Sequence, residues 1–140
     1  MPVSKRSRGR AFEFWVRDWC REHGAAVHVC GRKAVYMREK LKDGKPGALK
    51  LMTKGDDIFG CDLIALYPFH APLFIQATKD KSIKKRLEEI KKYPWNTLDQ
   101  YVKVQLWQQE ARAKVKIYSF NGKDLVETAR IINRKLFLRG

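Results

Sequence analysis

Two short apolar segments separated by a single turn constrain the fold of this chain most strongly. Residues 60–66 read Gly-Cys-Asp-Leu-Ile-Ala-Leu and residues 73–79 read Leu-Phe-Ile-Gln-Ala-Thr-Lys, with two prolines between them. Apolar runs of this length, bounded by Gly and Pro, predict a pair of buried strands. Each strand also carries a polar side chain, Asp62 on the first and Gln76 on the second. Because burying such a group without a partner costs about 1–3 kcal/mol, the two indicate a functional site.

The pairing of these two strands decides which polar side chains meet. A turn centred near residue 70 places Asp62 opposite Thr78. In that register Asp62, Gln76 and Thr78 share one face of the strand pair, while Lys79 lies on the other. A shift of one residue in the pairing moves every side chain of the second strand to the opposite face, so both placements of Lys79 stay open.

Length and charge indicate one domain with an anionic partner. The chain has 140 residues and carries 30 Lys and Arg against 15 Asp and Glu, a formal charge of +15. An excess of this size predicts a polyanionic ligand, and nucleic acid is the commonest. No apolar run approaches the roughly 18 residues that cross a membrane, so we expect no membrane partner.

Cysteine usage points to a reducing compartment. Cys20, Cys30 and Cys61 are odd in number and contain no Cys-x-x-Cys pair, so a disulfide framework is not expected. The N-terminal residues contain no apolar run typical of a signal peptide. We therefore expect a cytoplasmic protein of a bacterial, archaeal or phage-infected cell.

Residues 1–8 are polar and basic, which predicts a flexible arm. The hydrophobic periodicity of the remainder predicts a single α/β domain over residues 9–140. The expected helices cover residues 9–23, 81–93 and 124–136, and the expected strands cover residues 25–30, 48–53, 60–66, 73–79, 102–107 and 114–120. Asp80 is the expected N-cap of the second helix. Residues 31–46 are rich in turn signals and are assigned to neither class. This order predicts a central mixed β-sheet flanked by helices.

The polar residues of the central strands, with one acid of the first helix, predict a metal site. Glu13 lies at the edge of the apolar stripe of that helix, where it can face the site; a surface glutamate is the alternative. Mg²⁺ prefers hard oxygen ligands and keeps several waters, so we expect Glu13, Asp62 and Gln76 as its ligands, with Mn²⁺ as an alternative ion. A neighbouring lysine would orient water or stabilise charge on a phosphate. For Asp56 and Asp57 a solvated turn is the favoured role, and one of them is a reserve ligand.

Three segments together resemble the PD-(D/E)XK nuclease superfamily. They are Gly9 and Glu13 on the first helix, the segment Gly-Cys-Asp-Leu-Ile-Ala over residues 60–65, and the strand ending in Gln-Ala-Thr-Lys over residues 76–79. Within the superfamily the chain is most similar to Holliday junction resolvases of the archaeal and phage kind, which also open with a basic segment. The resemblance spans about residues 5–92. It implies a restriction-endonuclease-like fold and a homodimer.

The resemblance also implies roles for individual residues. Glu13 and Asp62 would be metal-site acids, and Cys61 stands where the motif has its proline.

The acidic-x-Lys element of the motif matches in one of two ways. If Lys79 is its lysine, Ala77 replaces the acid; if Gln76 replaces the acid, Thr78 occupies the lysine position. We favour Gln76 as the substitute, with Lys79 or Lys81 supplying the cation.

The sequence therefore predicts a Mg²⁺-dependent endodeoxyribonuclease that cleaves branched DNA such as a four-way junction and acts as a homodimer. The residues expected at the catalytic centre are Glu13, Asp62, Gln76 and Lys79. The residues expected to bind DNA phosphates are Lys5, Arg6, Arg8, Arg10, Lys81, Lys84 and Lys85. The alternatives are a restriction- or repair-type nuclease acting on duplex DNA, and a non-catalytic nucleic-acid-binding protein in which Asp62 is structural.

Overall fold

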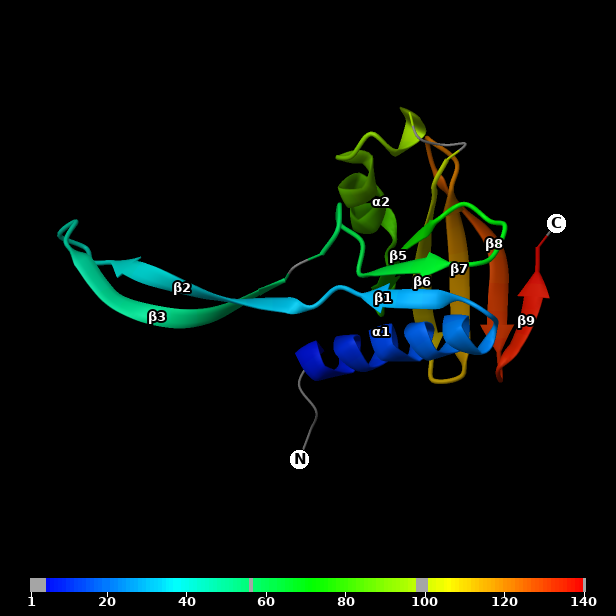
Figure 1. The fold of residues 1–140 in the computed structure, drawn as a ribbon, viewed down its shortest axis with the longest axis horizontal. Helices are drawn as coiled ribbons and strands as arrows, with labels where there is room; N and C mark the ends of the chain where they lie inside the picture. The colour runs from blue at the N-terminus through cyan, green and yellow to red at the C-terminus, as the bar shows by residue number, and fades with distance from the viewer. Residues whose placement is uncertain (1–4, 56, 98–100, 140) are drawn as a thin grey trace.

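A seven-stranded sheet in the order β1-β4-β5-β6-β7-β8-β9 organises the protein (Figure 1). The structure is a computed structural model that describes residues 5–55, 57–97 and 101–139. The strands of this sheet are β1 (Ala26–Val29), β4 (Leu63–Leu66), β5 (Leu73–Thr78), β6 (Lys103–Ala111), β7 (Lys114–Phe120), β8 (Leu125–Ile132) and β9 (Lys135–Leu138). Neighbouring strands are antiparallel except β5 and β6, which are parallel. The expected α/β class and mixed sheet are confirmed.

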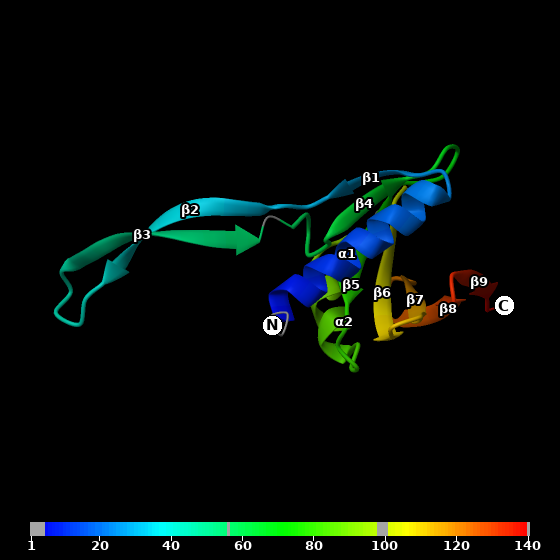
Figure 2. The same cartoon turned by 90° about the horizontal axis from the view of Figure 1, so that it is seen from below.

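Helix α1 (Lys5–Glu22) covers one face of the sheet (Figure 2). Its buried residues Phe12, Val16, Trp19 and Cys20 recur at helical spacing and pack against β4, β5 and the longer strands beyond them. The helix ends at Glu22 and is closed by a Schellman motif with its two hydrogen bonds, in which Gly24 has a φ of 98° that favours glycine.

Helix α1 begins four residues earlier than the sequence predicts. Residues 5–8 of the expected flexible arm are helical, so that expectation was wrong for them. Residues 1–4 lie outside the described residues.

The opposite face is covered by the crossover between β5 and β6, which contains α2 (Lys84–Lys91) and the 3₁₀ helix η1 (Trp95–Thr97). Ile90 and Trp95 form a second core there with Cys61 and Val104, and Phe74 packs against it. Because side chains alternate along a strand, β5 sends Ile75 toward α1 and Phe74 toward α2.

Helix α2 is shorter than predicted, and its expected cap is wrong. Its N-cap position is Ile83, without a side-chain cap hydrogen bond. The Asp80 carboxylate instead accepts a hydrogen bond of 2.9 Å from Arg86 one turn into the helix. An ion pair to a side chain has replaced the expected bond to the helix backbone.

The predicted closing helix over residues 124–136 is also wrong, because this segment forms the β8–β9 hairpin. The segment has apolar residues at helical spacing, but Ala129 and Ile131 are buried in the two-residue alternation of a strand. Asn133 and Arg134 both have positive φ, as the tight turn of such a hairpin requires.

Strands β2 (Arg32–Lys40) and β3 (Pro46–Gly55) form a separate two-stranded ribbon that projects from the body (Figures 1 and 2). The sequence predicts only a strand over residues 48–53 and leaves residues 31–46 unassigned. The strand over residues 48–53 is confirmed as part of β3, whereas β2 lies in the unassigned segment, whose Gly and Pro turn residues obscured its strand pattern.

The pairing of β4 with β5 differs from the predicted register by two residues. Leu63 pairs with Ile75 and Ala65 with Leu73, so Asp62, just before β4, lies level with Gln76 rather than with Thr78. A shift of two residues leaves every side chain on its face, and the expected shared face of Asp62 and Gln76 is preserved. Within the described residues, neither helix has both the length and the apolar character needed to cross a membrane.

Candidate functional site

Asp62 lies at a bend just before β4, where its backbone joins three segments of the chain. Its N–H donates to the carbonyl of Ile75 at 2.8 Å, and its carbonyl accepts from the N–H of Cys30 at 2.8 Å. Its side-chain Oδ2 accepts from the N–H of Ala77 at 2.9 Å. The carboxylate is therefore held in place by the sheet itself.

The environment of Asp62 disfavours its charge. The pKa of this carboxyl is raised to about 7, chiefly by burial, and the negative charges of Glu13 and Asp57 contribute in the same direction. The hydrogen bond from Ala77 and the positive charge of Arg86 act in the opposite direction and are outweighed. A carboxylate in this state gains from a cation beside it.

Gln76 on β5 is the buried amide level with Asp62. It is 2% exposed, and its Nε2 donates to the carbonyl of Gly60 at 3.0 Å and to Glu89 Oε2 at 3.1 Å. Its Oε1 has no hydrogen-bond partner among the described residues. Gly60 needs its positive φ of 76°, and a Cβ there would lie 3.2 Å from the Tyr93 ring. The amide is thus fixed by its nitrogen while its oxygen is left available.

Helix α2 brings two further charged side chains to the site. Glu89 accepts from Gln76 and lies 3.6 Å from Arg86, which also binds Asp80 at 2.9 Å. The hydrogen bond from Arg86 lowers the pKa of Asp80. The residues predicted from the sequence include neither Arg86 nor Glu89, although the i, i+3 spacing of these two residues beside Ile90 indicates that they share one edge of the helix.

Glu13 of α1 lies near enough to Asp62 to act on it electrostatically. Its Oε2 lies 2.9 Å from Arg10. Arg10 also donates to the carbonyl of Cys30 at 2.8 Å, so this expected phosphate ligand is already engaged at the site.

The structure does not bring every predicted residue to Asp62. Lys79 follows β5 as an exposed side chain, on the face of Ala77, which packs toward α1. Arg86, rather than Lys79, acts as the positive charge on Asp62. Thr78 is buried, and its hydroxyl accepts from the N–H of Asp80.

The predicted phosphate-binding residues fall into two groups. Lys81, Lys84 and Lys85 are exposed around the start of α2. The backbones of Lys5, Arg6 and Arg8 belong to α1, but their side chains lie outside the described residues. Asp56 also lies outside them, and Asp57 is exposed.

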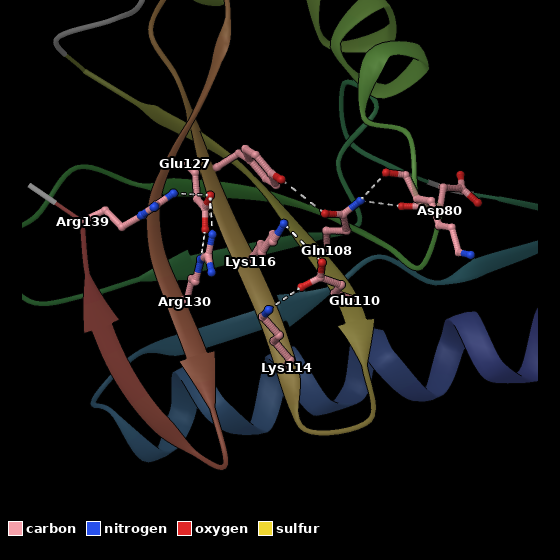
Figure 3. A network of polar contacts seen from close by, with 10 residues as sticks. Asp80, Gln108, Glu110, Lys114, Lys116, Glu127, Arg130 and Arg139 are labelled. Atoms are coloured by element: carbon pink, nitrogen blue, oxygen red, sulfur yellow. Dashed lines mark hydrogen bonds and ion pairs between the residues drawn. The ribbon is translucent and has the colours of Figure 1, made fainter.

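A buried glutamine on β6 fixes the segment between β5 and α2 (Figure 3). The Nε2 of Gln108 donates to the carbonyls of Asp80 at 2.7 Å and Lys81 at 3.0 Å, and its Oε1 accepts from the Tyr118 hydroxyl at 3.3 Å. This anchoring sets where Asp80 meets Arg86. Figure 3 also shows two neighbouring ion-pair groups, Glu110 with Lys114 and Lys116, and Glu127 with Arg130 and Arg139.

The oxygens around Asp62 have the chemistry that Mg²⁺ prefers. Among the described residues, no three His, Cys, Asp or Glu side chains gather closely enough to hold a metal ion by themselves. The candidate donors are the carboxylates of Asp62 and Glu13 and the unpartnered Oε1 of Gln76, which is an amide oxygen. Because Mg²⁺ keeps several waters, two carboxylates and one neutral oxygen fit its needs.

Comparisons with family models, curated proteins and solved structures found no match for this chain. The functional interpretation therefore rests on the residues and geometry of the site.

Proposed function

We propose that this protein is a Mg²⁺-dependent endonuclease acting on branched DNA. The observation that carries the proposal is the partly buried Asp62, whose pKa is raised to about 7, level with the buried amide of Gln76, whose Oε1 has no hydrogen-bond partner among the described residues. Burial penalises the charge of Asp62, and the Oε1 of Gln76 is left without a partner among the described residues, so both oxygens would gain from a bound cation. The restriction-endonuclease-like fold and the kinship with junction resolvases belong to the same proposal.

In this proposal the site residues have three roles: binding the metal ion, stabilising charge on the scissile phosphate and binding the neighbouring phosphates. Asp62, Glu13 and the Gln76 oxygen would hold the metal ion, which when bound supplies an activated water and stabilises phosphate charge. Arg86 lies where it can stabilise charge on the scissile phosphate, since its partners Asp80 and Glu89 hold it on the Asp62 side of α2. Exposed lysines at the start of α2 would bind the neighbouring phosphates.

A homodimer is part of the proposal because a junction must be cut on two opposing strands. Two active sites related by a two-fold axis match the two-fold symmetry of such a substrate.

A non-catalytic nucleic-acid-binding protein is the second candidate. It is favoured by Gln76, which stands where the motif has an acid, and by the ion pair that already engages Glu13. In that case Asp62 is structural and the net charge of +15 accounts for all DNA affinity.

The decisive experiment compares cleavage of a four-way junction and of linear duplex of the same sequence, with Mg²⁺ and with EDTA. We expect the wild-type protein to cleave the junction in the presence of Mg²⁺. Asp62→Asn should abolish this cleavage, whereas the control Asp124→Asn, at an exposed position, should retain it. Junction binding in EDTA should survive in both variants. An Asp62→Asn protein that cleaves within a few-fold of wild type would refute the site, and a wild type that binds without cleaving would favour the second candidate.

A further inference from the structure

The β2–β3 ribbon, residues 32–55, is a strongly basic segment of the chain. It carries eight Lys and Arg side chains against two acidic ones, a net charge of +6 out of the +15 of the whole protein. The two strands pack mainly against each other and extend away from the sheet (Figures 1 and 2). Isolated two-stranded ribbons are only marginally stable in water, so this element gains stability from a partner.

Apolar side chains on the ribbon are exposed as well. Leu49 and Leu51 of β3 are 56% and 61% exposed, and Leu41 in the turn is 48% exposed. These leucines do not serve the core of this protein. Exposed apolar side chains among cations are suited to DNA, because the cations bind phosphates while the apolar groups contact base edges.

The dimensions of the ribbon suit a duplex. Strands of nine and ten residues span about 30 Å at 3.3 Å per residue, close to the roughly 34 Å of one turn of B-DNA. The major groove, about 12 Å wide, admits a two-stranded β-ribbon.

The base of the ribbon lies at the candidate active site. Cys30, two residues before β2, donates its N–H to the carbonyl of Asp62, and Asp57, two residues after β3, acts electrostatically on the same residue. A duplex held along the ribbon would therefore have its backbone directed to Asp62.

We propose that the β2–β3 ribbon is a DNA-binding element that lies along a groove of duplex DNA next to the candidate active site. The inference rests on the proposed function in taking DNA as the substrate, and it names the element that holds the duplex. A second copy of the chain is the less suitable occupant, since pairing two ribbons would bring two charges of +6 together.

The test measures binding to an unbranched 30-base-pair duplex in EDTA over a range of salt concentrations. Exposed Lys42 and Lys45 at the turn of the ribbon are changed together to Ala, and exposed Lys123 and Lys135, on the β8–β9 side, form the control pair with the same change of charge. Each phosphate contact contributes about 0.9 to the salt slope and about fivefold in affinity at 0.15 M salt. We expect the ribbon pair to lose up to about 30-fold in affinity and nearly two units of slope. The control pair should lose far less.

A second variant removes the outer half of the ribbon. Met37 pairs with Lys50, so residues 38–49 can be replaced by an Asn-Gly turn without disturbing the core. We expect a melting temperature close to that of wild type and a larger loss of duplex affinity than for the lysine pair.

The outcomes separate this inference from the proposed function. Unchanged affinity and slope in both ribbon variants of a protein that cleaves junctions would overturn the ribbon proposal alone. A truncated protein that becomes monomeric in sedimentation but keeps its DNA affinity would assign the ribbon to self-association and overturn it too. A ribbon-dependent affinity in a protein that never cleaves DNA would support the ribbon and refute the nuclease.

Discussion

Replacing Asp62 by Asn is expected to stabilise the protein at alkaline pH while destroying the proposed activity. The folded state raises the pKa of this carboxyl from 3.8 to about 7, chiefly by burial. A carboxyl whose pKa is raised on folding contributes stability below its unfolded pKa, and that contribution is lost as the pH rises through the folded pKa. The stability of wild type should therefore fall between about pH 4 and pH 7 on account of this group.

The size of the effect follows from the shift. About three pKa units at 1.36 kcal/mol each give up to about 4 kcal/mol of destabilisation at pH 8. Asn has nearly the same shape, cannot ionise, and keeps a carbonyl oxygen to accept the N–H of Ala77. The free energy of unfolding of Asp62→Asn should thus match that of wild type near pH 4 and exceed it increasingly toward pH 8.

Urea unfolding of both proteins in EDTA, from pH 4 to pH 8, measures this difference. Asp124→Asn is the matched control because it removes the same charge at an exposed position from a chain of net charge +15. Adding Mg²⁺ at pH 8 should stabilise wild type and leave Asp62→Asn unaffected, since a ligand that binds only the folded state shifts the unfolding equilibrium. Parallel stability curves for the two proteins between pH 5 and pH 8 would refute the reasoning.

Three further substitutions test the rest of the site. Gln76→Glu should retain or strengthen Mg²⁺ binding, measured by calorimetry, because it adds a carboxylate at similar size. Gln76→Ala should weaken both Mg²⁺ binding and cleavage. Equal Mg²⁺ affinity in the two variants would exclude Gln76 as a ligand. Ala77→Glu should lower the free energy of unfolding in urea by more than about 2 kcal/mol, because it directs a charge into the core beneath α1, and a tolerated change would mean that this strand faces the other way. Arg86→Gln should reduce junction cleavage more than Lys79→Gln, and the reverse order would restore Lys79 as the cation of the site.

The parts of the fold that the sequence predicts well are those with one buried face. The stripe of α1 and the two central strands have such a face, and their periods can be read directly. Residues 125–132 fit both a helical and a strand period, and their β-branched residues and the following Asn-Arg turn decide for the strand only once β7 is available as a partner.

The site was predictable where local alternation fixes it. Asp62 and Gln76 share a face in any register that shifts by an even number of residues, so a prediction wrong by two still placed them together. Glu89 and Arg86 depend instead on which side of α2 turns toward β5. Their spacing beside Ile90 indicates that they share one edge of the helix, but only the packing of Ile90 with Cys61 and Trp95 brings that edge to Gln76.

The acidic residues of the candidate site lie next to the basic β2–β3 ribbon. The protein has 15 acidic residues, and a cluster of five surrounds the site: Glu13 and Asp57 act electrostatically on Asp62, and Asp80 and Glu89 pair with Arg86. In a chain of net charge +15, such a cluster does not serve solubility, and the repulsion within it lowers stability. Under the proposed function the cluster has a role, because an acidic centre would attract the cation while the surrounding basic surface would attract the phosphates. The strongly basic ribbon begins and ends beside this acidic cluster, so the same geometry that delivers a duplex would direct its backbone to the cation.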